Sequence, residues 1–162
     1  MKIDLHCHTL KAKKGDGKTR NIDAKQFRTI MNNNNVKIAA ITNHNVFDAC
    51  QYNEFVKECG NDLQIWPGIE LDVLSRIIDE NGKCETGHVI IISNPSYVEE
   101  FSKKVEELIN NTAPDKVEIS VNQLLEFYSS LKDAIILPHY RKNHSLDLGT
   151  IEEIRKSIED EY

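Results

Sequence analysis

The run VKIAAITNH, residues 36–44, decides the fold of this chain. Its first seven residues are mostly apolar, which is typical of a strand buried on both faces of a parallel sheet. Helices are expected on both sides of this strand. Asp23 with Gln26 forms a capping box that opens one helix, and another helix is expected to run to about Cys59. A buried strand between two helices is the repeating unit of an α/β domain.

The same alternation continues along the chain. Asn81-Gly82 is a strong hairpin signal, and Ser120 with Gln123 and Thr150 with Glu153 have the spacing of helix starts. The expected strands are 3–8, 36–42, 63–66, 69–75, 89–93 and 134–137, and the later helices are 96–111, one from Ser120, and 150–162. Strands alternating with helices predict an α/β domain with a largely parallel sheet.

Composition limits the function classes. The 162 residues suffice for one domain with a real core, 1–162, and 40% of them are hydrophobic. The net charge of −6 disfavours nucleic-acid binding by overall charge and leaves room only for a local basic patch. The sequence has no apolar run of the roughly 20 residues that cross a bilayer, so no membrane association is expected.

The four cysteines form no CxxC pair, which argues against zinc-ribbon and thioredoxin-like sites. We interpret them as reduced thiols of a cytoplasmic protein. Cys7, between His6 and His8, has two interpretations: a metal ligand, or a small buried packing residue. Neighbouring side chains in a strand face opposite ways, which favours packing if both histidines face a site.

Five of the six histidines adjoin predicted strands, and Glu70 follows Pro67-Gly68. One histidine beside a strand is usually structural, but several at one rim, together with a carboxylate, have the composition of a metal site. The His-x-His spacing places two imidazoles on one face of a strand, about 7 Å apart along it. The five histidines are His6, His8, His44, His88 and His139; His88 fits least well because it opens its strand.

Segments spread over nearly the whole chain resemble the motifs of the PHP (polymerase and histidinol phosphatase) superfamily, in the family's order. They are residues 4–9, like D-L-H-x-H-T; 41–45, like I-T-D-H-D/N; 67–70, like P-G-x-E; 87–89, like the histidine-bearing fourth strand; and 137–139, like the family's A-H-P motif.

The resemblance implies a distorted (β/α)7 barrel whose rim binds two or three divalent ions. The ligands it implies are His6, His8, His44, Glu70, His88 and His139. Asp16 is the nearest candidate for a further ligand from the loop, although a turn-forming role beside glycine is the alternative. Asn43 stands where the family has Asp, which is expected to alter hydrogen bonding around the ligands.

The closing D-x-H motif of the family has no counterpart, and Asp147 has neither the order nor the spacing for it. The barrel is therefore expected to be incomplete at its C-terminal end. His144 is interpreted as a loop residue, with substrate contact as the alternative. The chain is expected to be either a piece of a longer protein, with a C-terminal ATPase or other domain as a partner, or a short barrel.

Mixed histidine and carboxylate ligands suit Zn, Mn or Fe ions better than Ca²⁺. Such ions activate water, so hydrolysis of a phosphate ester needs no protein nucleophile, and it is the family's usual activity. The alternatives are a non-catalytic metal-binding or regulatory module and, less favoured, hydrolysis of a non-phosphate bond as in amidohydrolase-like barrels.

Basic residues crowd the loop after the first motif and follow His139. If both loops lie at the rim, they would surround the site entrance with positive charge. Such an entrance would suit an anionic, phosphate-containing substrate, either a phosphomonoester or a nucleic acid; the alternative is two solvated basic loops. The loop residues are Lys11, Lys13, Lys14, Lys18 and Arg20; the predicted substrate contacts are Lys14, Arg141 and Lys142.

Overall fold

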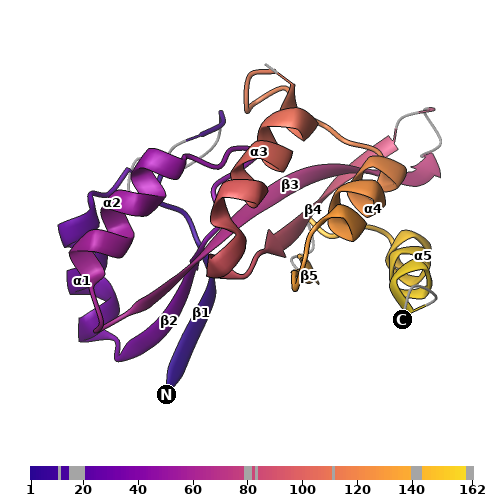
Figure 1. Cartoon of the computed structure of the whole chain (residues 1–162). Coiled ribbons are helices and arrows are strands. Elements are labelled where there is room, and N and C mark those ends of the chain that lie inside the picture. The colour runs from indigo at the N-terminus through magenta and orange to yellow at the C-terminus, as the bar shows by residue number, and fades with distance from the viewer. Residues whose placement is uncertain are drawn as a thin grey trace.

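The computed structural model describes residues 1–10, 12–14, 21–78, 82, 84–110, 112–139 and 144–159. The described part of the chain is a mixed α/β fold (Figure 1). In chain order the elements are β1 (Lys2–Cys7), α1 (Ala24–Asn33), β2 (Val36–Ile41), α2 (Ala49–Cys59), β3 (Gln64–Ile78), β4 (Cys84–Ile92), η2 (Pro95–Tyr97), α3 (Val98–Ile109), α4 (Val121–Ser130), β5 (Ile135–Pro138) and α5 (Leu148–Glu159).

The five strands form a curled, half-barrel sheet in the order β1-β2-β3-β4-β5. β1, β2 and β3 run parallel, whereas β3 pairs antiparallel with β4, and β4 with β5. The prediction of a largely parallel sheet is therefore wrong for the second half. The predicted hairpin explains why: a parallel crossover needs a dozen or more residues, and the few residues between Ile78 and Cys84 allow only a reversal.

β3 is one long strand where the sequence predicted two, separated at Pro67-Gly68. Pro67 stays in register with Ile41 of β2, and its carbonyl accepts a hydrogen bond from the Ser93 amide at 2.9 Å. The proline's missing N–H is tolerated because β4 ends at this level. A Cβ on Gly68 would lie 2.8 Å from the Thr42 methyl carbon and 3.0 Å from a backbone oxygen, so glycine permits the close approach of the neighbouring strands.

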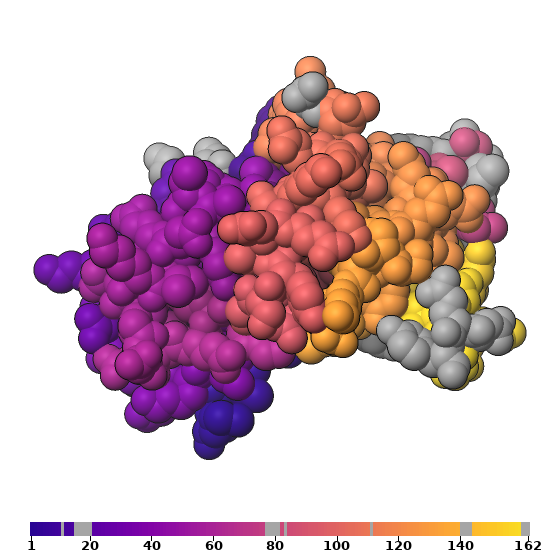
Figure 2. All heavy atoms as spheres, viewed as in Figure 1, coloured from indigo at the N-terminus to yellow at the C-terminus, as the bar shows by residue number. Residues whose placement is uncertain are grey.

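The helices cover one face of the sheet and enclose two apolar clusters. Phe27 and Phe55, from α1 and α2, pack against β1, β2 and the start of β3. Phe101 and Leu124, from α3 and α4, pack against β3 and β4. Figure 2 shows α3 and α4 forming a continuous surface in front of the strands. No helix in the described ranges has the length and apolarity needed to cross a bilayer.

Helix starts follow the predicted chemistry at two of three places. The capping boxes Asp23–Gln26 and Ser120–Gln123 are both present, at α1 and α4. The last helix begins at Leu148 instead of Thr150, because Asp147 is its cap: the Asp147 Oδ1 accepts from the Thr150 amide at 2.8 Å. The expected end of that helix, at Tyr162, lies outside the described residues.

Candidate metal centre

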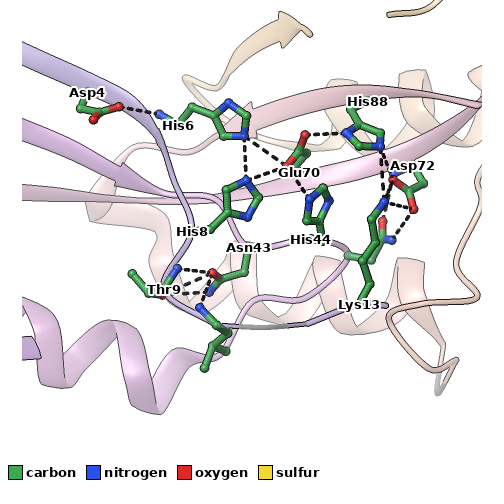
Figure 3. Close-up of polar contacts among 12 residues, drawn as sticks. Asp4, His6, His8, Thr9, Lys13, Asn43, His44, Glu70, Asp72 and His88 are labelled. Atoms are coloured by element: carbon green, nitrogen blue, oxygen red, sulfur yellow. Dashed lines mark hydrogen bonds and ion pairs between the residues drawn. The ribbon is translucent and has the colours of Figure 1, made fainter. Parts of the chain in front are cut away.

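Glu70 of β3 lies at the centre of a group of histidines (Figure 3). Its side chain is 1% exposed. Its Oε2 lies 3.1 Å from His6 Nε2, 2.9 Å from His8 Nε2 and 3.2 Å from His44 Nε2. Its Oε1 lies 2.8 Å from His88 Nδ1. Four predicted histidine ligands thus converge on Glu70, a predicted carboxylate ligand.

His6 and His8 come from the end of β1, and their Nε2 atoms are 2.8 Å apart. Cys7, between them, is buried on the other side of the strand in the cluster with Phe27 and Phe55. Burial raises the pKa of the Cys7 thiol well above its ordinary value, which keeps it in the unreactive protonated form. The packing interpretation of Cys7 is the one that this arrangement supports.

His44 follows β2, and its backbone forms an isolated parallel β-bridge with Glu70. The backbone amide of Asn45 donates to the backbone carbonyl of Glu70 at 2.7 Å. The backbone amide of Glu70 donates to the backbone carbonyl of Asn43 at 3.1 Å. Asn45 adopts a left-handed conformation with φ of 50°, which asparagine tolerates better than most residues. The chain reversal after β2 therefore holds His44 against the carboxylate.

Asn43, which precedes His44, holds the end of β1 in place. Its Oδ1 accepts from the backbone amides of Thr9, at 2.8 Å, and Leu10, at 3.0 Å. Its Nδ2 donates to Gln51 Oε1 at 3.2 Å. This side chain therefore positions the segment that follows His8.

Asp72 is a buried carboxylate that the sequence reasoning missed. It lies opposite His88 in the β3–β4 register, and its Oδ1 is 3.1 Å from His88 Nε2. Asn45 exchanges two hydrogen bonds with it, through the Asn45 Nδ2 and the Asp72 amide, each 3.0 Å long. The available signal was its spacing: residues i and i+2 of a strand share a face, so Asp72 follows Glu70 on the same side.

His139 and His144 complete the group of rings. The His139 amide donates to the His88 carbonyl at 2.9 Å, and its ring centroid lies 5.2 Å from that of His6. The His144 ring stacks on His88 at 4.6 Å between centroids. His144 lies outside the helices and strands, as predicted, and its ring lies against the centre.

Three of the other predicted site residues are not placed, and one is. Asp16, Arg141 and Lys142 lie outside the described residues, so their roles stay predictions. Lys14 is described and is exposed. Its neighbour Lys13, which the sequence reasoning counted only as part of the basic loop, instead reaches Asp72, with its Nζ 2.8 Å from Asp72 Oδ1.

The titration of the site follows from its contacts. Burial alone would raise the pKa of Glu70, but hydrogen bonds from His6, His8 and His88 outweigh it and hold that pKa far below its ordinary range. Burial likewise opposes ionisation of Asp72, yet His88 and Lys13 lower its pKa to about 2. Burial would lower the pKa of His88, but its contacts with Asp72 and Glu70 raise it to about 9. Both carboxylates are therefore charged near neutral pH, when cations can bind them.

Three overlapping sets of side chains offer ligand atoms that all lie within 4.8 Å of one another. They are His6, Glu70 and His139; His8, His44 and Glu70; and His44, Asp72 and His88. The buried Nδ1 of His8 has no hydrogen-bond partner among the described residues. Imidazole nitrogens directed at one another and at a carboxylate are the donor set that divalent transition metals prefer, so the residues present fit such ions.

Comparison with known proteins gives a likeness of fold to solved structures. No known protein family and no curated protein matches the sequence. The fold is similar to the crystal structure of a candidate metal-dependent phosphoesterase from Bifidobacterium adolescentis ATCC 15703, with a TM-score of 0.60 and 9% sequence identity. The match covers 96% of this chain and 74% of that chain. The likeness shows that the two chains share a fold. The buried histidine and carboxylate groups that could hold a metal ion are a feature of this chain's own structure.

Proposed function

We propose that this chain is a metal-dependent phosphoesterase of the PHP type, and that it hydrolyses phosphate esters at a centre of two or three divalent ions around Glu70. The observation that carries the proposal is the convergence of His6, His8, His44 and His88 on the two oxygens of that carboxylate. The fold likeness to a candidate metal-dependent phosphoesterase supports it.

The two oxygens of Glu70 face different partners. Oε2 faces His6, His8 and His44, while Oε1 faces His88. Glu70 belongs to two of the three ligand sets, so it could help to hold an ion in each, and Zn, Mn or Fe would suit the mixed donors. When bound, such ions would lower the pKa of a water molecule and neutralise charge on phosphoryl oxygens.

The protein's own contribution is positioning. Asn43 fixes the backbone that follows His8, and Asn45 fixes both Glu70, through its amide, and Asp72, through its side chain. Hydrogen bonds of this kind orient ligands and tune their basicity. The described residues of the centre leave the choice between a phosphomonoester and a nucleic acid open, and the basic loops remain the proposed determinants. The four free cysteines are consistent with a cytoplasmic location.

The test is hydrolysis by protein stripped with a chelator and reloaded with Zn²⁺, Mn²⁺ or Fe²⁺ in turn. An aryl phosphate and a single-stranded oligonucleotide serve as substrates. We expect metal-dependent turnover that His44→Ala lowers by roughly 100-fold or more, because it removes a direct ligand. The control is Tyr52→Phe in α2, away from the centre. It removes a buried hydroxyl that donates a hydrogen bond to the Ile65 carbonyl of β3, and it should keep that activity.

Loaded protein that turns over neither substrate would contradict the proposal and favour a non-catalytic module. A panel of carboxylic esters and amides added to the same assay would reveal the amidohydrolase-like alternative.

A further inference from the structure

Lys13 occupies one end of the metal centre in an unusual way. Its Nζ lies 2.8 Å from both oxygens of Asp72 and 3.3 Å from His88 Nε2 (Figure 3). The Lys13 side chain is 20% exposed and the Asp72 side chain 10%. The ammonium is thus inserted among residues that are otherwise candidates for a metal ion.

The third ligand set consists of His44, Asp72 and His88, all buried. Two of its three members, Asp72 and His88, are the direct partners of the Lys13 ammonium. A divalent ion bound by the same atoms would lie within a few ångströms of that ammonium. Two positive charges at such a distance repel strongly where solvent is scarce, so a metal ion at this set would have to displace Lys13.

The charges favour Lys13 in that competition. The ammonium lies 2.8 Å from both oxygens of buried Asp72, and it supplies this positive charge from within the chain, without capture from solution. A tethered group competes at a high effective concentration. Asn45 donates from Nδ2 to Asp72 Oδ2 and accepts from the Asp72 backbone amide, and together these bonds hold the carboxylate beside the ammonium.

We infer that Lys13 is a built-in cation that takes the place of a third metal ion at the His44–Asp72–His88 set. This inference rests on the proposed function and sharpens it: the native centre holds its divalent ions at the two sets that share Glu70. The third cation of the centre is then a lysine ammonium that belongs to the protein.

The test is the metal content of the full chain, measured by elemental analysis after loading with Mn²⁺ or Zn²⁺ and removal of excess ions. Lys13→Ala should bind one more ion per chain than the wild-type protein. Lys14→Ala, which removes the neighbouring exposed lysine, should bind the wild-type number. In the double variant Lys13→Ala/Asp72→Asn the additional ion should disappear.

Lys13→Ser gives a second truncation of the same side chain should Lys13→Ala fold poorly by circular dichroism. An unchanged metal content in the truncated variants would overturn the inference, whatever number the wild-type protein binds. Failure of the proposed function would be separate, because it would show in the wild-type protein itself as an absence of bound metal or of turnover.

Discussion

The two halves of the sheet deliver their functional residues in different ways. In the parallel half, β1 and β2 place His6, His8 and His44 at or just beyond their carboxyl ends. In the antiparallel half, Glu70, Asp72 and His88 lie within strands and meet through the β3–β4 register. β3 belongs to both halves, so Glu70 joins them.

This difference teaches which kind of site residue a sequence can reveal. A strand end in a parallel sheet is visible as an apolar run followed by a polar residue, and all such ends meet at one rim. A residue in the middle of a strand reaches the site only if the register is right, because a slip of one position turns its side chain to the other face.

The strongest test of whether the two halves form one site is to change Glu70, the residue that joins them. Glu70→Gln removes the charge that His6, His8, His44 and His88 surround. We expect metal affinity to fall by more than the roughly 10–100-fold that loss of an outer hydrogen-bond partner costs, and activity to fall with it. Competition with a fluorescent chelator measures the affinity.

Glu54→Gln, in the exposed part of α2, provides the matched control and should bind metal normally. If Glu70→Gln bound metal as tightly as the wild-type protein, the two halves would not be joined through this carboxylate.

Within the parallel half, substitution of Asn43 tests whether the hydrogen bonds between the segment after β1 and the segment after β2 stabilise the protein. Asn43→Ala leaves the amides of Thr9 and Leu10 without their acceptor. Loss of that acceptor should lower the free energy of unfolding by about 2–3 kcal/mol. Asn43→Asp keeps the acceptor oxygen and should cost clearly less, although it loses the donor to Gln51. Urea unfolding of the metal-free proteins compares them, and equal losses in the two variants would argue against this role.

Within the antiparallel half, substitution of Asp147 should have a smaller effect on the free energy of unfolding, and this effect should depend on pH. Asp147 caps α5 and also contacts Ser75 of β3. Burial would raise the pKa of Asp147, but hydrogen bonds from Ser75 and Thr150 lower it below its ordinary value. Its stabilisation is therefore present above the ordinary pKa of an aspartate and is lost as the pH falls through the lowered pKa.

Asp147→Ala should cost about 1 kcal/mol at pH 7, as loss of a helix cap does. Chemical denaturation at pH 7 and near pH 3 measures the free energy of unfolding of both proteins. The difference between variant and wild type should be smaller at the lower pH. A gap that widened on acidification would show that the carboxylate form is not the stabilising one.

The sequence predicted the parallel half and its residues well. The apolar run before His44, the His-x-His spacing and the capping box at Asp23 all depend on local patterns, and the structure bears out the elements they imply. Glu70 and His88 were candidates from the same pattern of polar residues beside strands, the resemblance to the PHP motifs supported them, and the structure brings them together.

The antiparallel half depended on features without a local signature. Pro67-Gly68 looked like a break between strands, because the sequence does not show that β4 ends beside Pro67 or that Gly68 lies tightly between its neighbours. Asp72 and Lys13 were missed as site residues since their meeting depends on the β3–β4 register and on the path of a loop.

The central claim is that the histidines gathered around Glu70 hold divalent ions. Crystals grown with Mn²⁺ or Zn²⁺ test it directly through an anomalous difference map. The account predicts strong peaks within coordination distance of Glu70, His8 and His44, and none at Lys13. A map with no peak near Glu70, from crystals in which the metal is present in solution, would contradict it.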